Sequence, residues 1–411
     1  MRSSTERQLG IPRKLYDRDA AGPLAGVRVL DLTRLIAGGQ LGVVLGDLGA
    51  DVVKVEQPGA GDPLRSVTAA GYDAHWRAYA RNKRSVTLNL KDSRGRELLL
   101  RLAEQADVLA ENYAPGVLER LCGGPEALLE RNPRLVVTRI SGWGQTGPLA
   151  SRPGFGTLAE AFSGFTHLNG PADGPPHPPP MSLADAVAGT YAAAATVAAL
   201  FHVRSGGAGQ VVDVSLYEPL FSILGPEATV LAATGATRKR GDSAKVSSVR
   251  GVFETSDGHW LALSAATDEI VLRLFGALAR LEILDDPRFA TSEARLANRD
   301  ALHEIVAMEF ATRTREEMLA LAEANRITIG PVYDVVDLVA DEHVHARETI
   351  VEMVDEDGEA VAMHNIVPRL SRTPGTIRRP APRLGEHNAE LLGELGIEAD
   401  ELHALEDAGV I

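Results

Sequence analysis

The stretch VRVLDLTRLIAGGQLGVVLGDLGADVVKVE, residues 27–56, decides the fold of this chain. Two β-rich runs, VRVLDL at 27–32 and DVVKVE at 51–56, enclose a segment of helical length that is rich in small residues. The pattern predicts a strand, a helix and a second strand. Because the connection is a helix and not a hairpin, the two strands must run parallel.

The same alternation continues on both sides of an irregular segment. Residues 147–180 are rich in Gly and Pro and predict a long loop or crossing segment. Alternating strands and helices predict an α/β fold with a doubly wound, Rossmann-like sheet, whose ligands bind at the carboxyl ends of the strands. Further strands are expected at 85–90, 106–112, 134–141 and 210–216, and helices at 93–105, from Pro115, at 183–203 and at 218–234.

A second domain is expected because 411 residues are too many for one ordinary domain. A basic, polar stretch at 238–248 is the predicted linker. The pattern then changes to GVFETSDGHWLALSA, residues 251–265, which is typical of a β-hairpin with Ser-Asp-Gly at its turn. Helical patterns follow, so the second, smaller domain is predicted to be α+β. A further hairpin is predicted at 349–365.

Composition excludes several classes of protein. Hydrophobic residues make up 45% and charged residues 24% of the chain, the balance of a folded globular protein. With 42 Lys and Arg against 56 Asp and Glu, the net charge of -14 argues against a broad surface for nucleic acid or an anionic membrane. Cys122 is the only cysteine, and the polar N-terminus lacks the apolar core of a signal peptide. A cytoplasmic protein is expected, with the apolar residues 191–203 in a buried helix and not in a membrane span.

Basic residues stand near the ends of the predicted strands. Arg34 follows the first strand, Lys83 and Arg84 precede the third, and Lys91 follows it. Cations in these places could hold a phosphate-bearing cofactor, and a solvated charged face is the alternative. The small residues 37–39 open the first predicted helix, where backbone N–H groups attract anions. A tight turn that binds nothing explains them equally well.

The segment GPADGPP, residues 170–176, places Asp173 between glycines and prolines. Asp-Gly is a favoured turn pair, so turn formation alone explains the segment. The alternative is a carboxylate held on a rigid loop that a bulky substrate can approach closely. No metal site is predicted, because His343 and His345 lie two apart and point to different faces of a helix. No GxSxG nucleophile motif occurs.

Ordered blocks of the sequence resemble one enzyme family. LAGVRVLDLTRLIAGG, RNKRSVTLNLKDSRGRELL and LGEHNAELLGELGI, with others between them, are similar to successive blocks of the class III coenzyme A transferases, the formyl-CoA transferase and carnitine-CoA transferase group (CaiB/BaiF-like). The resemblance covers residues 24–411. It implies transfer of CoA from a donor acyl-CoA to an acceptor carboxylic acid, with coenzyme A as a substrate and no permanently bound cofactor.

The resemblance also implies an architecture. A large CoA-binding α/β domain is expected to be discontinuous, with a small domain between its two parts and two subunits threaded through each other as an interlocked homodimer. The expected boundaries are an N-terminal extension at 1–23, the large domain at 24–236, the small domain at 237–333 and the return to the large domain at 334–411.

The site residues implied by the resemblance are carried over by position. Asp173 stands where the family has its nucleophile, which forms a mixed anhydride with the donor acyl group and then an aspartyl-CoA thioester. Tyr113 is expected to lie against the adenine, and Lys91 and Arg120 are expected to face phosphates. The positions expected to bind CoA are Arg34, Ala37, Lys91, Asn112, Tyr113, Arg120 and Gly142.

Several positions depart from the family pattern, among them Gly39 in place of a usual Pro. Gln57 stands where the formyl-CoA enzyme has an Arg, and Ser141 stands where that enzyme has a Lys. Arg34 or Arg139 is expected to compensate for these two lost cations. Glu160 replaces a usual Gln, which predicts an atypical acyl pocket.

Two other functions stay open from the sequence. The α-methylacyl-CoA racemase branch of the fold uses a His and Asp pair, and Asp185 matches that Asp. Phe155 stands where the His is needed, however, and a phenyl ring cannot act as a base. Asp185 is then expected to be a structural carboxylate at a helix N-terminus. A non-catalytic CoA-binding paralogue is the other alternative, against which Asp173 argues.

Overall fold

The computed structural model describes residues 9–241 and 249–411. The chain forms two compact units: unit 1 is Met1–Arg240 with His343–Ile411, and unit 2 is Gly241–Glu342. The domain boundaries expected from the family resemblance lie a few residues earlier, after residues 236 and 333. Residues 242–248 of the predicted linker and residues 1–8 of the predicted N-terminal extension lie outside the described residues.

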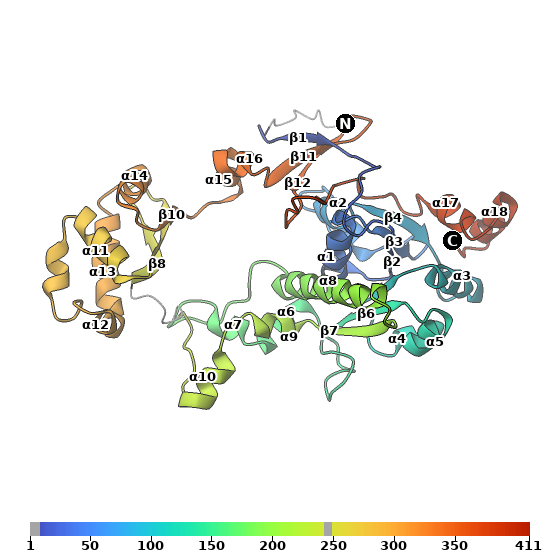
Figure 1. The fold of residues 1–411 in the computed structure, drawn as a ribbon, viewed down its shortest axis with the longest axis horizontal. Helices are drawn as coiled ribbons and strands as arrows, with labels where there is room; N and C mark the ends of the chain where they lie inside the picture. The colour runs from blue at the N-terminus through green and yellow to red at the C-terminus, as the bar shows by residue number, and fades with distance from the viewer. Residues whose placement is uncertain (1–8, 242–248) are drawn as a thin grey trace. The chain divides into compact units, whose positions relative to one another are not determined.

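Unit 1 is built on a six-stranded sheet with the strand order β4-β3-β2-β5-β6-β7 (Figure 1). All of its strand pairs are parallel. The chain starts in the middle at β2, winds outward to β4, returns to β5 beside β2 and winds outward to β7. This is the order of dinucleotide-binding Rossmann folds, and the winding direction reverses between β2 and β5. The strands are β2 (Arg28–Asp31), β3 (Asp51–Glu56), β4 (Lys83–Thr87), β5 (Val108–Glu111), β6 (Val136–Ser141) and β7 (Gln210–Ser215). The predicted α/β fold and all six predicted strands of the sheet are confirmed.

Helices cover both faces of this sheet. The helices of unit 1 as a whole are α1 (Leu35–Asp47), α2 (Ala74–Tyr79), α3 (Ser93–Glu104), α4 (Val117–Cys122), α5 (Gly124–Arg131), α6 (Gly156–Phe162), α7 (Phe165–Leu168), α8 (Leu183–Arg204), α9 (Tyr217–Ser222), α10 (Glu227–Thr234), α17 (Asn388–Gly393) and α18 (Ala399–Asp407), with α16 (Glu342–Ala346) at the boundary between the units and the 3-10 helix η1 (Pro63–Ser66).

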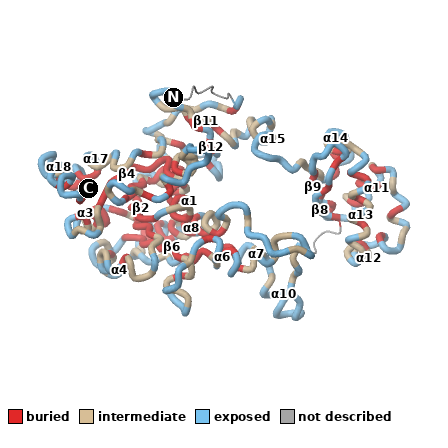
Figure 2. Tube along the Cα trace, turned by 180° about the vertical axis from the view of Figure 1, so that it is seen from behind, coloured by how far each residue is buried: buried red, intermediate tan, exposed pale blue. Residues whose placement is uncertain are grey.

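Successive residues of each strand face two separate cores, because side chains alternate across a sheet. Val29 belongs to a core formed with α1 and α8, whereas its neighbour Leu30 belongs to a core formed with α3, α17 and α18. Buried residues are concentrated along the strands and the sheet-facing sides of these helices (Figure 2). The C-terminal helices therefore complete one of the two cores of the N-terminal sheet.

Helix α8 has the length and hydropathy of a membrane span. One side of it is buried in the core beside α1, at residues that include Ala184, Ala188 and Ala192. Small side chains on this side allow close packing: a Cβ added at Gly189 would lie 2.4 Å from the carbonyl oxygen of Ala37. This burial agrees with the helix predicted to be buried from the sequence.

Two local expectations are wrong. The segment 147–180 is not only a loop, because it contains α6 and α7. The helix predicted at 218–234 is broken into α9 and α10, because Gly225 has a φ of 94° and Pro226 follows it as the N-cap of α10. A residue in the left-handed region followed by proline ends one helix and permits another to begin.

A small sheet joins an N-terminal strand to a hairpin of the C-terminal part of unit 1. Its strand order is β1-β11-β12, with β1 (Arg13–Leu15), β11 (Ile350–Val354) and β12 (Ala360–His364). The predicted hairpin at 349–365 is confirmed by the antiparallel pairing of β11 with β12. Part of the expected N-terminal extension is thus ordered, since β1 pairs in parallel with β11.

Unit 2 has an antiparallel sheet of order β10-β9-β8 with helices packed against it. The predicted hairpin at 251–265 is confirmed by the pairing of β8 with β9, and the buried aromatic residues Phe253, Phe275 and Phe310 lie in one core. The elements are β8 (Val249–Glu254), β9 (Trp260–Ala265), β10 (Ile329–Pro331), α11 (Asp268–Ala277), α12 (Ser292–Ala297), α13 (Arg299–Phe310), α14 (Arg315–Asn325), α15 (Val335–Ala340) and the 3-10 helix η2 (Leu281–Asp285).

Candidate active site

A cavity of about 450 Å³ lies in unit 1 at the carboxyl ends of β2, β3, β4 and β5. Parallel α/β sheets bind their ligands at this edge, where the strand order reverses. The segments that follow the four strands all contribute to its lining, with Arg34 after β2, Gln57 after β3, Lys91 after β4 and Tyr113 after β5. The fold therefore brings three of the predicted CoA-binding residues, Arg34, Lys91 and Tyr113, to one cavity.

Arg34 is held in place by Asn112 across the reversal point of the sheet. The backbone N–H of Arg34 donates to Oδ1 of Asn112 at 2.8 Å, and Nδ2 of Asn112 donates to the carbonyl oxygen of Arg34 at 2.7 Å. The Arg34 guanidinium lies over the ring of Tyr113, 5.7 Å from its centroid. Both polar atoms of the Asn112 amide are thus engaged by the backbone of Arg34.

Exposed cations border this cavity. Lys91 and Arg34 are exposed, and within the described residues neither side chain has an ion-pair partner. The backbone N–H of Lys91 donates to Oδ1 of Asn89 at 3.1 Å, which fixes the turn after β4. These two side chains are therefore available to an anionic ligand.

The other predicted CoA-binding residues do not line the cavity. Arg120 is exposed on α4, next to Leu121, which does line it. Ala37 is buried inside α1. A Cβ added at Gly142 would lie 2.7 Å from the Cα of Gly154, so a close approach of two backbone segments explains this glycine. Roles for Ala37, Arg120 and Gly142 in CoA binding stay predictions.

The small residues 37–39 are not an open anion cradle. Helix α1 begins before them, at Leu35, and Gly38 and Gly39 are buried within it. A Cβ added at Gly38 would lie 1.9 Å from Oγ1 of Thr33, so packing against the preceding turn requires a glycine there. Packing therefore explains the two glycines of this turn, while a role of Ala37 in CoA binding stays a prediction.

Lys83 and Arg84 are buried and ion-paired, so the interpretation that they face a phosphate is wrong. Nζ of Lys83 lies 2.8 Å from Oδ2 of Asp31. Arg84 donates from Nε to Oδ1 of Asp51 at 2.9 Å and also pairs with Glu390 of α17. A buried cation requires such partners, because an unpaired one costs several kcal/mol.

Arg139 does not compensate for the missing cations. Its Nε donates to Oε1 of Glu111 at 2.6 Å and its Nη1 donates to Glu119 at 2.9 Å, so its charge is already neutralised inside unit 1. Of the two expected compensating residues, only Arg34 lies at the cavity. Gln57 also lines the cavity, whereas Ser141 is buried and its hydroxyl has no hydrogen-bond partner among the described residues.

Sequence reasoning missed three charged residues of the cavity wall, Lys54, Glu56 and Asp62. Lys54 interrupts the apolar run of β3, and a charged residue inside a buried strand is a signal that could have identified it. Nζ of Lys54 lies 3.0 Å from Oδ2 of Asp62. Both side chains are almost fully buried.

Asp173 lies on a loop of unit 1 that is closed by its own hydrogen bonds. The backbone N–H of His177 donates to the carbonyl oxygen of Asn169 at 3.0 Å, and Nδ2 of Asn169 donates to the carbonyl oxygen of His177 at 2.9 Å. Arg240 also donates to the carbonyl oxygens of His167 and Gly174. The loop is thus fastened at its base and presents the Asp173 carboxylate to solvent.

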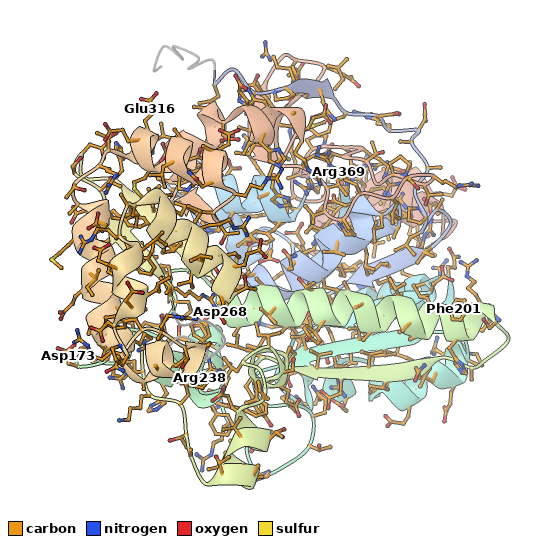
Figure 3. The ribbon with its side chains drawn as sticks, turned by 60° about the vertical axis from the view of Figure 1, so that its left-hand side comes forward. Asp173, Phe201, Arg238, Asp268, Glu316 and Arg369 are labelled. Atoms are coloured by element: carbon orange, nitrogen blue, oxygen red, sulfur yellow. The ribbon has the colours of Figure 1, made fainter. Side chains whose placement is uncertain are left out.

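The structure does not bring Asp173 to the cavity. Asp173 lies beyond the N-terminal end of α8, whereas Phe201 marks the other end of that helix (Figure 3). It is not among the residues that line the cavity at the sheet edge.

Comparison with known proteins decides between the alternatives left by the sequence. The model of CoA-transferase family III matches residues 24–388. The chain belongs to this family. It is therefore a class III CoA-transferase of the CaiB/BaiF family, and it transfers CoA between an acyl-CoA and a carboxylic acid.

Named relatives and solved structures agree with this assignment. The succinyl-CoA–L-malate CoA-transferase beta subunit of Chloroflexus aurantiacus is 40% identical over 397 residues, covering 95% of this chain and 98% of the relative. The succinate–glutarate CoA-transferase of Agrobacterium fabrum is 34% identical, covering 91% and 96% of the two chains. A crystal structure of a CaiB/BaiF family protein from Brucella suis superimposes with a TM-score of 0.80 at 33% identity, covering 91% and 100%.

One feature of this CoA-transferase family member is a half-buried carboxyl near the N-terminus of α8. Burial and the nearby Glu160 together raise the pKa of Asp185 to about 6. Glu160 accepts the backbone N–H of Ala184 at 3.2 Å, so it and not Asp185 caps the start of the helix. Phe155, at the N-cap of α6, offers no base, so the proton acceptor of a racemase is missing there.

A second and larger cavity, of about 720 Å³, lies in unit 1 between α2, the β11–β12 turn and the segment 380–386. It shares no lining residue with the cavity at the sheet edge. Arg65 lines it, stacked 3.7 Å from the centroid of Trp76 and paired with Glu56. Arg77 at this cavity is paired with Asp73 and Glu359, and none of the predicted CoA-binding residues lines it, so we assign the chemistry to the cavity at the sheet edge.

Proposed function

We propose that this enzyme moves CoA from succinyl-CoA to a small dicarboxylic or hydroxy-dicarboxylic acid, with Asp173 as the nucleophile. The observation that carries the proposal is the Asp173 carboxylate, presented on a loop that hydrogen bonds close at its base. The choice of acids is supported by the relatives, which are named for succinyl-CoA with L-malate, D-citramalate or glutarate.

The first half of the reaction transfers CoA to the enzyme. A carboxylate oxygen of Asp173 attacks the thioester carbonyl of succinyl-CoA, the C–S bond breaks and CoA leaves as a thiolate. The product is a mixed anhydride between Asp173 and succinate. The thiolate then attacks the aspartyl carbonyl carbon, which releases succinate and leaves an aspartyl-CoA thioester.

The second half repeats these steps with the acceptor. A carboxylate oxygen of the acceptor attacks the aspartyl thioester, which gives a second anhydride and releases the thiolate again. The thiolate attacks the acceptor acyl carbon, forms the new acyl-CoA and restores the Asp173 carboxylate. Each bond that breaks is replaced by one of similar energy, so the reaction needs no ATP and only requires that water is excluded.

CoA would bind through its nucleotide part at the cavity of the sheet edge. Its phosphates would meet Arg34 and Lys91, whose charges are free among the described residues, with Arg120 as a further contact. Its adenine would stack on Tyr113, whose ring lines the cavity. Asn112 would act indirectly, because its amide is occupied by the backbone of Arg34.

An interlocked homodimer is part of the proposal. A monomer rarely exposes many large apolar side chains together, because covering them removes apolar area from water. Phe162 of α6 and Tyr217 of α9 meet edge to face at 5.0 Å, which joins the apolar surfaces of these helices. The exposed apolar residues of α6 and α8–α10, with their flanks, include Phe155, Leu158, Phe162, Phe201, Phe221, Ile223 and Leu231.

Trapping of the enzyme-bound intermediate tests the nucleophile. Purified protein would be incubated with succinyl-CoA and then with hydroxylamine, which converts an aspartyl thioester or anhydride into a hydroxamate that mass spectrometry locates. We expect the label on Asp173, and we expect Asp173→Asn to lose transfer activity by at least a thousandfold. Asp19→Asn, at another exposed aspartate of unit 1, is the matched control. Full activity of Asp173→Asn would exclude the proposed nucleophile.

The mass of the protein in solution tests the assembly. Light scattering on a sizing column should give twice the mass of one chain. A monomer with full transfer activity would contradict the interlocked homodimer.

A further inference from the structure

The start of α1 is occupied by a carboxylate from the chain itself. Oδ1 of Asp62 accepts the backbone N–H of Leu35 at 3.1 Å and that of Leu64 at 2.9 Å. The other oxygen, Oδ2, lies 3.0 Å from Nζ of Lys54. Asp62 is 4% exposed and Lys54 is 2% exposed, and both line the cavity at the sheet edge.

These contacts occupy two positive groups that would otherwise attract an anionic ligand, the N-terminus of α1 and the ammonium group of Lys54. The N-terminus of a helix as long as α1 carries partial positive charge, and phosphates bind readily at such ends. Burial opposes the charge of Lys54, but Asp31, Asp62 and Glu56 outweigh it and raise the pKa of Lys54, so its ammonium group stays charged. Asp62 thus binds the N-terminus of α1 and shares the Lys54 ammonium group with Asp31, whose Oδ1 lies 3.6 Å from Nζ.

We propose that Asp62 is a positioning and specificity-determining residue for CoA, an inference that rests on the proposed CoA site. Its carboxylate takes the place that a phosphate would otherwise occupy at the start of α1, and so directs the phosphates to Arg34 and Lys91. It also fixes Leu35, which follows Arg34 directly, while Asn112 fixes the backbone of Arg34 from the other side.

The charge and the hydrogen bond of Asp62 have opposite effects on CoA, and two substitutions separate them. Asp62→Asn keeps an oxygen that accepts the Leu35 N–H but removes a negative charge beside the phosphates. We expect CoA to bind about fivefold tighter at low salt, with most of the gain lost at high salt. Asp62→Ala also removes the acceptor, so Arg34 loses its position and CoA should bind about tenfold more weakly.

Calorimetric titration of CoA into the full-length protein measures these effects, together with KM and kcat for succinyl-CoA. The lower Kd of Asp62→Asn should appear as a lower KM with kcat little changed. Asp73→Asn is the matched control, because it removes the same charge from a carboxylate that pairs with Arg77 outside this cavity. The double variant Lys54→Met with Asp62→Asn removes the ion pair without changing the net charge, and it should bind CoA as the wild type does.

Each outcome decides between distinct explanations. Opposite changes of the CoA Kd in Asp62→Asn and Asp62→Ala support the proposal. Weaker binding in both variants, with the control unchanged, means a purely structural role and overturns it. If Asp62→Asn fails to fold, the double variant Lys54→Met with Asp62→Asn is measured instead. A CoA Kd of this double variant clearly different from that of the wild type, in either direction, also overturns the proposal. Failure of the proposed CoA site itself looks different, because Arg34→Gln would then bind CoA as tightly as the wild type.

Discussion

Two groups of cations border the large sheet, and they differ in burial and in whether a carboxylate of the protein neutralises their charge. Lys83, Arg84 and Arg139 are buried, and each pairs with at least one carboxylate at hydrogen-bond distance. Arg34 and Lys91 are exposed at the cavity of the sheet edge, and neither is paired among the described residues. Burial separates the groups: a charge without water must have a protein partner, whereas an exposed one is available to a ligand.

The strongest test of this comparison removes one buried cation. Burial would raise the pKa of Asp31, but Lys54 and Lys83 outweigh it and lower the pKa to about 2. Lys83→Met leaves part of this charge uncompensated, and we expect it to lower the free energy of unfolding by about 3 kcal/mol. Urea denaturation measures the change. If Lys83→Met has the same free energy of unfolding as the wild type, the buried ion pairs do not stabilise the sheet.

The next test concerns the half-buried carboxyl of Asp185, which has no ion-pair partner among the described residues. Because the pKa of Asp185 is raised from 3.8 to about 6, the folded protein binds this proton more tightly than the unfolded chain does. Stability should therefore fall as the pH rises from about 4 to about 6. Asp185→Asn removes this loss, and we expect it to be more stable than the wild type by about 2 kcal/mol at pH 7.5.

Denaturant unfolding at two pH values checks the Asp185 prediction. The difference between Asp185→Asn and the wild type should shrink toward zero near pH 4. A constant difference at both pH values would show that a change of packing, and not the carboxyl charge, is responsible.

A smaller effect is expected when an exposed cation is removed. Lys91→Gln should weaken CoA binding about tenfold, the value of one lost charge-assisted contact, and change the free energy of unfolding by less than about 0.5 kcal/mol. Arg94→Gln is a control of equal charge on the same segment, because Arg94 is exposed and pairs with Asp92. Calorimetry with CoA and urea denaturation give both numbers. A clear loss of stability in Lys91→Gln would remove the distinction between the two groups.

The smallest effect is expected from adding a cation. Gln57→Arg places a guanidinium on an exposed residue of the cavity lining, and we expect CoA to bind about threefold tighter at low salt. Gln105→Arg, at an exposed position after α3, is the control and should leave the CoA Kd unchanged. Equal affinities of the two variants would argue against a phosphate near residue 57.

Repeating patterns along the chain predicted the sheet well. The six strands of the sheet were recognisable because each is a short apolar run between helical segments, and this periodicity depends on neighbours in sequence. The break between α9 and α10 at Gly225 and Pro226 was missed, although both residues are strong signals for the end of a helix.

The candidate site was predicted in part. Arg34 and Lys91 lie at the carboxyl edge of the sheet, as their positions after strands suggested, and Asn112 and Tyr113, which only the family resemblance implied, lie beside Arg34. The sequence could not show that the Asn112 amide is already occupied. It also could not separate Lys91 from Lys83, because both are lysines near an end of β4 and only their burial differs.

The sequence by itself determined the α/β class, the winding of the strands and the family, because these depend on periodicity and on ordered blocks of residues. Only the tertiary structure decided which charges hold the fold and which are free to bind. Arg84 meets Glu390, more than three hundred positions away, and Asp62 reaches both Leu35 and Lys54. Packing between distant segments of the chain determines which charged side chains meet. The free energy of a charged side chain in the fold depends on its burial and on these partners, and not on its neighbours in sequence.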